Sequence, residues 1–258
     1  MTDVPFFDQN AWPITSSDGV VFLETASSFE ALYEQARSAE DRILTDVQVA
    51  RLPNGAGLWN ADEWRIRSKS ATRLQQALGV GGTKHILEVG CGNGWLSGLL
   101  HRSRHQVLGI DLFTLELKQA ARVFHSGPCF ARCSPFATQL PTRYFDVVVL
   151  AASLQYFEDL PRLMDRLFTL LKPGGKVHVM DTVLYEDEHN ARAARERTER
   201  YYANIQVPEL SAHYHAHMLT DLQGLARCQV LAAPRSASLL HRLLKRSDPF
   251  SHLVLDRV

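Results

Sequence analysis

A short apolar run that breaks into a glycine turn constrains the fold of this chain more than any other stretch. Residues 85–89 are typical of a buried parallel strand, Gly90, Gly92 and Gly94 follow at alternate positions, and a helical pattern begins at Trp95. Glycine permits a positive φ and a close approach of a ligand to the backbone. The start of the helix offers unpaired N–H groups to an anionic group. The stretch therefore predicts the ligand-binding end of a doubly wound α/β sheet.

The glycine spacing decides which ligand this turn suits. A dinucleotide fingerprint needs a third Gly or Ala where this chain carries Trp95 or, in the other register, Ser97. Residues 88–94 instead read Glu-Val-Gly-Cys-Gly-Asn-Gly, which resembles motif I of the class I S-adenosylmethionine-dependent methyltransferases. A nicotinamide-dependent oxidoreductase is accordingly the weaker alternative.

Two further motifs agree with this resemblance in order and spacing. Asp111 ends a predicted strand over residues 106–111, about 20 residues after the first glycine, where an acidic residue binds ribose hydroxyls in nucleotide-binding α/β folds. The structural alternative for Asp111 is a helix cap, but Thr114 already suits that purpose. Residues 171–175, Leu-Lys-Pro-Gly-Gly, match the turn before the fifth strand of these methyltransferases.

The resemblance implies a Rossmann-like methyltransferase fold, a doubly wound and mostly parallel seven-stranded sheet with an antiparallel last strand. We expect residues 1–58 to form an N-terminal extension and residues 59–258 to form the methyltransferase domain, with a lid insertion at 183–217. The extension is predicted to contain a small hairpin, made by residues 12–14 and 19–23, and a helix from Ser28. The remaining predicted helices cover residues 59–78, 114–124, 160–171, 186–202, 218–226 and 238–246, and the remaining strands 129–133, 144–150, 176–181, 228–233 and 251–256.

The same resemblance assigns cofactor-binding roles residue by residue. The methionyl part of S-adenosylmethionine would lie against Glu88, Gly90, Cys91, Gly92, Asn93, Gly94 and Trp95. Asp111, followed by Leu112, would hold the ribose, and Ala152, Ser153 and Gln155 would form the floor beneath the sulfonium. Ser134, Pro135 and Phe136 would border the adenine, at a position where many relatives carry an acidic residue.

Arg67 is the predicted partner of the methionyl carboxylate, because guanidinium groups match carboxylates bidentately. Arg65 is an equivalent candidate, and a solvated helix face is the structural alternative for both.

Catalysis by such an enzyme depends largely on alignment of the acceptor with the activated methyl group. A general base is needed only if the acceptor must lose a proton, and Tyr156, His213, His215 and His217 are the candidates. The alternating histidines would also suit a metal on a strand, but no cysteine or carboxylate supports them nearby, so we expect no metal.

The charge balance bears on partners. The chain has 28 Lys and Arg against 28 Asp and Glu, which removes the electrostatic footprint of a nucleic-acid binder. We therefore expect a small-molecule acceptor, with oxygen, carbon or nitrogen as the methylated atom. A non-catalytic binding protein of this fold and an RNA methyltransferase are the alternatives. The chain shows no signal-peptide pattern and no membrane-length apolar run, which predicts a cytoplasmic protein, and its oligomeric state is left open.

Overall fold

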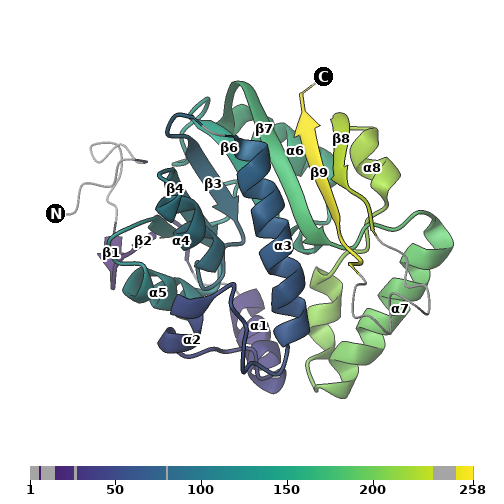
Figure 1. The fold of residues 1–258 in the computed structure, drawn as a ribbon. Coiled ribbons are helices and arrows are strands. Elements are labelled where there is room, and N and C mark those ends of the chain that lie inside the picture. The colour runs from purple at the N-terminus through teal and green to yellow at the C-terminus, as the bar shows by residue number, and fades with distance from the viewer. Residues whose placement is uncertain (1–5, 7–14, 26–27, 80, 235–247, 258) are drawn as a thin grey trace.

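A nine-stranded sheet runs through the described part of the protein, in the order β1-β2-β5-β4-β3-β6-β7-β9-β8 (Figure 1). The computed structural model describes residues 6, 15–25, 28–79, 81–234 and 248–257. The strands are β1 (Thr15–Ser17), β2 (Val20–Phe22), β3 (His85–Val89), β4 (Gln106–Asp111), β5 (Cys129–Arg132), β6 (Phe145–Ala151), β7 (Leu171–Thr182), β8 (Arg227–Ala232) and β9 (Ser251–Asp256).

The helices connect these strands and cover the sheet. They are α1 (Ser28–Ala39), α2 (Asp46–Arg51), α3 (Ala61–Leu78), α4 (Trp95–Arg102), α5 (Thr114–Val123), α6 (Leu160–Leu170), α7 (Glu188–Asn204) and α8 (Leu219–Gln223), with 3₁₀ helices η1 (Leu154–Tyr156) and η2 (Pro208–His213). Within the described residues, no helix combines the length and the apolar character that crossing a membrane requires. The predicted insert at 238–246 lies outside the described residues.

Seven of the strands, β5-β4-β3-β6-β7-β9-β8, form the predicted doubly wound sheet. Strands β3 to β7 pair in parallel, and β9 lies antiparallel between β7 and β8. The prediction of seven strands was nevertheless low by two, because an N-terminal hairpin joins the same sheet. Its first strand is Thr15–Ser17, and the strand predicted at 12–14 lies outside the described residues. Strand β2 pairs antiparallel with β1 and parallel with β5, with Val20 opposite Phe130.

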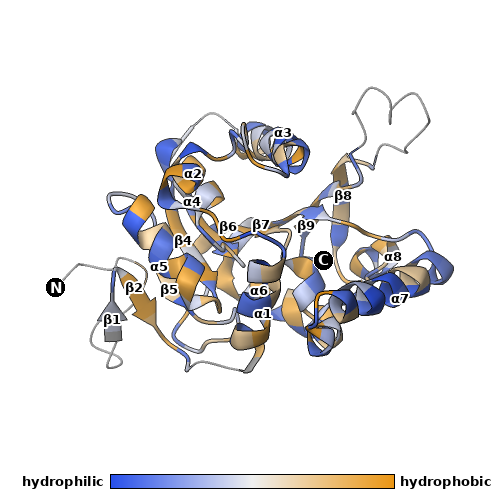
Figure 2. Cartoon of the chain, turned by 90° about the horizontal axis from the view of Figure 1, so that it is seen from below, coloured by the Kyte–Doolittle hydropathy of each residue, from blue (hydrophilic) through white to orange (hydrophobic). Residues whose placement is uncertain are grey.

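Helices cover both faces of the sheet (Figure 2). Alternate residues of each central strand point to opposite faces, so that Ile86 packs with Leu74 of α3 and Leu96 of α4 on one face. The neighbouring Leu87 packs in the cluster that contains Leu163 of α6 on the other face. Both faces are therefore apolar, as buried parallel strands require.

The predicted Leu-Lys-Pro-Gly-Gly turn lies inside β7. Phe145 pairs with Leu171 and Val147 with Lys176, so the segment between the two β7 residues bulges out of the ladder. Gly174 has a φ of 78° there, which suits glycine. Beyond the bulge the strand runs in register to the sheet edge where β3, β4 and β6 also end.

A histidine pair is buried between β7 and β9. His178 Nδ1 lies 3.1 Å from His252 Nε2, and the two residues are 3% and 0% exposed. Burial lowers the pKa of His178 to about 3 and that of His252 to about 4. Both rings are therefore neutral in the folded protein at pH 7.

Acidification should destabilise the fold through this pair. Because both folded-state pKa values lie below the ordinary value of about 6.5, the unfolded chain binds protons below pH 6.5 that the folded chain does not. Stability should be complete above pH 6.5 and fall toward pH 4, by about 1.4 kcal/mol per histidine for each pH unit. Urea unfolding at pH 7, 6 and 5 measures this slope, and a His178→Gln/His252→Gln variant should lose it. An equal slope in both proteins would contradict the assignment.

Candidate functional site

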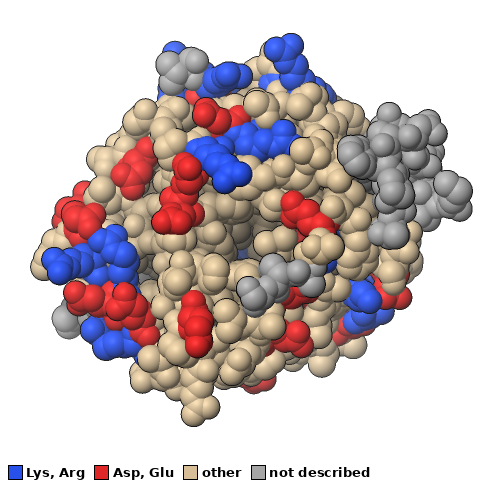
Figure 3. All heavy atoms as spheres, turned by 180° about the vertical axis from the view of Figure 1, so that it is seen from behind, with Lys and Arg blue, Asp and Glu red and all other residues tan. Residues whose placement is uncertain are grey.

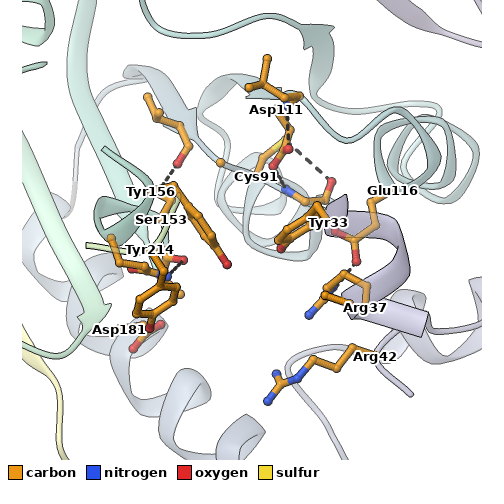
Figure 4. A pocket seen from close by; sticks show the side chains of 18 of the residues that line it. Tyr33, Arg37, Arg42, Cys91, Asp111, Glu116, Ser153, Tyr156, Asp181 and Tyr214 are labelled. Atoms are coloured by element: carbon orange, nitrogen blue, oxygen red, sulfur yellow. Dashed lines mark hydrogen bonds and ion pairs between the residues drawn. The ribbon is translucent and has the colours of Figure 1, made fainter. Parts of the chain in front are cut away.

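A cavity of about 630 Å³ opens at the carboxyl ends of β3, β4, β6 and β7 (Figure 4). The glycine loop after β3 and the residues after β6 line it from the sheet. Helices α1, α3 and α7 contribute the other walls. The carboxyl edge of an open α/β sheet, at the point where the strand order reverses, is where such folds bind ligands.

Gly90 begins the loop under tight steric limits. Its φ is 75°, and a Cβ placed on it would lie 2.5 Å from Cβ of Ser153. The N–H groups of Gly90 and Cys91 both donate to the carbonyl of Ile110, at 2.8 and 3.1 Å. The loop is thus tied to β4 and pressed against the segment after β6, with its backbone facing the cavity.

Gly94 has a different purpose from the one that its spacing suggests. It does not line the cavity. A Cβ there would lie 2.7 Å from Cβ of Ala120 and 2.8 Å from the ring of Phe130. Gly94 therefore lets the loop pack against α5 and β5.

Asp111 ends β4 with its carboxylate held by backbone donors. Oδ2 accepts from the N–H of Gly92 at 2.8 Å, and Oδ1 accepts from Leu112 and Phe113 at 2.7 and 2.9 Å. Burial raises the pKa of Asp111, and these N–H groups oppose the shift. The carboxylate joins the glycine loop to the end of β4 and lines the cavity.

Glu88 stands at the base of the loop. It is 2% exposed, and its Oε2 accepts from the Ser97 hydroxyl at 2.5 Å. Burial raises the pKa of Glu88 to about 8, so the carboxyl group is mostly neutral at pH 7.

Helix α1 closes one side of the cavity and is held there by ion pairs. Arg37 of α1 lies 2.7 Å from Glu116 of α5. Glu30 accepts from the buried Arg132 at 2.7 Å and from the N–H of Thr114 at 2.8 Å. These contacts place Tyr33 of α1 in the cavity wall.

Aromatic rings from separate elements meet in the part of the cavity between α1 and α7. We call this set the aromatic compartment; it consists of Phe29, Tyr33, Tyr156, Tyr202 and Tyr214. The ring of Tyr156 lies 5.8 Å from those of Tyr33 and Tyr214, edge to face in both cases. Burial raises the pKa of Tyr156, so its phenol is neutral at pH 7 and can donate a hydrogen bond.

Most of the predicted site residues line this cavity. They are Arg67, Glu88, Gly90, Cys91, Gly92, Asn93, Trp95, Asp111, Leu112, Ser134, Pro135, Ala152, Ser153, Gln155 and Tyr156. The other candidates do not line it: Arg65, Gly94, Phe136, His213, His215 and His217. The guanidinium of Arg162 instead lies over the ring of Phe136, 4.5 Å from the ring centroid.

His213 and His215 lie on either side of Tyr214 in the sequence. His213 is exposed and its ring contacts Phe29 at 5.1 Å, while His215 donates its N–H to the carbonyl of Gln155 at 2.7 Å. Tyr214, between them, lines the cavity. Within the described residues, no group of three side chains is placed to hold a metal ion.

Sequence reasoning missed the wall made by α1 and the carboxylate of Asp181. A local signal existed for Asp181, a polar residue at the end of a buried strand, at the sheet edge already predicted to bind the ligand. The α1 wall had no such signal, since its position depends on ion pairs with α5 and β5.

Charges on the outer surface are mixed. On the face shown in Figure 3, the described acidic and basic side chains alternate without an extended basic stripe. Among the four arginines that line the cavity, Arg37 pairs with Glu116, and Arg42 and Arg67 both pair with Glu63.

Comparison with known proteins agrees with this fold. Residues 87–179 match the methyltransferase domain family. Over 103 residues the chain is 34% identical to an uncharacterized methyltransferase of Mycobacterium tuberculosis, covering 40% of this chain and 52% of that protein. Over 118 residues it is 36% identical to a ubiquinone biosynthesis O-methyltransferase of Psychrobacter arcticus, covering 41% and 43%. The chain thus spans about half the length of the curated relatives it matches.

The structural comparison covers more of the chain. Geranyl diphosphate C-methyltransferase from Streptomyces coelicolor A3(2) aligns with a TM-score of 0.60 at 15% identity, over 91% of this chain and all of that one. The fold is therefore the Rossmann-like fold of class I methyltransferases. Within that fold, residues 87–179 resemble the methyltransferase domain family in sequence as well.

The steric limit at Gly90 leads to a prediction. Gly90→Ala should lower stability by several kcal/mol, because it adds a clash with Ser153 to the roughly 1 kcal/mol cost of a positive φ. Gly79→Ala is the matched control, since Gly79 has a φ of 76° and no atom within 4 Å of the added Cβ. Thermal unfolding of both variants measures the difference. Equal losses would show that Ser153 yields without cost.

Proposed function

We propose that this protein is an S-adenosylmethionine-dependent methyltransferase that acts on a small-molecule acceptor. The observation that carries the proposal is the junction of Gly90–Gly92 with Asp111 at the cavity edge. There, glycine backbone that tolerates no Cβ lies beside a carboxylate at the end of the adjacent strand. Backbone close to the ligand and an acidic group for ribose hydroxyls are what a nucleoside-containing cofactor needs.

The lining residues suit the parts of this cofactor in order. Cys133, Ser134 and Pro135 border the cavity near β5, where the adenine would lie, and Asp111 would accept from the ribose. The backbone of Gly90 and Cys91 would face the methionyl part. The cofactor supplies a methyl group already activated by its sulfonium, so the protein's task is to orient the acceptor toward it and exclude water.

The aromatic compartment is the proposed acceptor site. Its rings offer apolar surface, and its phenols offer hydrogen-bond donors that stay neutral at pH 7. Three of the four arginines that line the cavity, Arg37, Arg42 and Arg67, form ion pairs with glutamates. We therefore favour an acceptor with an apolar or aromatic body over one that relies on a phosphate group. Nitrogen, oxygen or carbon is the methylated atom, and nucleic acid is not the acceptor.

A cytoplasmic location belongs to the same proposal. All four cysteines are free: Cys91, Cys129, Cys133 and Cys228. Free, reduced cysteines are usual in cytoplasmic proteins.

Asp111→Asn tests the cofactor. The substitution keeps the side-chain volume and removes the charge, so affinity for S-adenosylhomocysteine should fall at least about tenfold, the loss expected for a hydrogen bond to a charged group. Isothermal titration calorimetry on the full chain measures it, and Asp165→Asn, on the exposed face of α6, is the control. Absence of binding in the folded wild-type protein would reject the proposal.

A further inference from the structure

The N-terminal hairpin places a carboxylate behind the cavity wall at the end of β5. Glu24, two residues after β2, accepts from the N–H of Ser134 at 2.7 Å and from the Ser134 hydroxyl at 3.0 Å. Ser134 lines the cavity and Glu24 does not. The carboxylate of Glu24 can therefore act on a ligand only through Ser134.

Backbone contacts fix Glu24 in this place. Phe22 of β2 lies opposite Arg132 in the parallel pairing with β5, and the N–H of Leu23 donates to the carbonyl of Arg132 at 3.2 Å. The guanidinium of the same arginine donates to the carbonyl of Glu24 at 2.6 Å. Glu24 is thus held at its own carbonyl and at the preceding residue, so its side chain has a defined position beside Ser134.

Glu24 takes up both hydrogen-bond donors of Ser134. A carboxylate can only accept hydrogen bonds, so in both contacts the proton belongs to Ser134 and points toward Glu24. A serine hydroxyl oxygen has two acceptor positions, and the N–H of Phe136 occupies one of them at 3.3 Å. Ser134 thus keeps one acceptor position, and no donor, for a ligand in the cavity.

The neighbouring residues in this part of the wall add no strong donor. The N–H of Cys133 donates to the carbonyl of Asp111 at 3.0 Å, and Pro135 has no N–H. Burial raises the pKa of the Cys133 thiol, which leaves a neutral S–H, a weak donor. The described segment 133–135 lines the cavity and therefore offers a ligand hydrogen-bond acceptors but no free N–H or O–H donor. We call this segment the acceptor edge.

The acceptor edge favours a ligand group that donates a hydrogen bond. In the proposed function, the base of the cofactor lies against this edge. Adenine carries an amino group at C6, which is a donor, whereas a 6-oxo purine carries a lone pair at the same position. A lone pair placed against the oxygen of Ser134 would have no proton between the two atoms. Such an unsatisfied contact is enough to lower affinity at least about tenfold.

We propose that Glu24 is a positioning residue that makes the cavity specific for a 6-amino purine. By binding both donors of Ser134, it turns the hydroxyl oxygen of that residue into an acceptor for the amino group of the base. The inference rests on the proposed function and adds to it a role for the N-terminal hairpin, which lies outside the matched residues 87–179. An amino group on the methyl acceptor would present the same donor, and the experiment separates these two sources.

Calorimetry with two ligands tests this role. S-adenosylhomocysteine carries the 6-amino group, and its deaminated analogue S-inosylhomocysteine carries a 6-oxo group on the same scaffold. The wild-type protein should bind the former at least about tenfold more tightly. Glu24→Gln should reduce this preference to within about threefold, because the new amide donates to Ser134 Oγ and turns the hydroxyl proton toward the cavity. Ser134→Ala should reduce it similarly by removing the acceptor.

The ratio of the two affinities separates specificity from a structural role. If Glu24 only holds the hairpin in place, Glu24→Gln will lower both affinities by the same factor and leave the ratio unchanged, which would overturn the inference. Glu34→Gln is the matched control, because Glu34 is exposed on α1 of the same extension, and it should change neither affinity. Ser134→Ala keeps the N–H that donates to Glu24, so the ratio can be measured even if Glu24→Gln does not fold.

The remaining outcomes distinguish the role of Glu24 from the proposed function. Equal affinity of the wild-type protein for both ligands would show that the donor facing Ser134 does not come from the cofactor. That result would overturn the inference and leave the cofactor assignment intact. A preference that survives both substitutions would show that another part of the cavity recognises the base, and the inference would fail. Binding of neither ligand to the folded protein would reject the proposed function as well.

Discussion

The shape of the cavity depends on one buried guanidinium. Arg132 of β5 is 2% exposed and donates to Glu30 at 2.7 Å, to the Thr114 hydroxyl at 2.9 Å and to the carbonyl of Glu24 at 2.6 Å. Removing one partner of such a buried pair costs about 3–5 kcal/mol, since the other charge is left uncompensated. These contacts hold the hairpin and α1 against the sheet edge. Without these contacts, the sheet edge would still line the cavity, but α1 would not be held in place as one of its walls.

Local patterns in the sequence were sufficient to predict the sheet and the sheet edge that carries the glycine loop and Asp111. The predicted strands over 106–111 and 251–256 coincide with β4 and β9, because a continuous apolar run with clear ends needs no distant information. The glycine loop and Asp111 lie together as predicted, since parallel neighbours end at the same edge. For the same reason most of the predicted cofactor residues line one cavity.

Residues whose placement depends on distant contacts could not be found in this way. The α1 wall requires the pairing of Glu30 with Arg132, 102 residues later. In the segment 213–215, the turn at the end of η2 directs Tyr214 inward and leaves its neighbouring histidines outside the cavity, and no sequence period distinguishes these orientations. Gly94 is the opposite case. The sequence correctly indicated that a glycine is required at this position, but the reason for it, close packing against Ala120 and Phe130, could not be predicted.

The parallel pairing of β2 with β5 has a consequence for how the chain acquires its shape during synthesis. Val20 lies opposite Phe130, and Glu24 binds Ser134, 110 residues away. During synthesis, the segment 20–24 therefore has no docking surface until β5 and α5 have been made. Contacts of such long sequence separation form late in folding. The lateral wall of the cavity should accordingly be assembled after the central sheet, so that nascent chains pass through an open-sided stage before they can enclose a ligand.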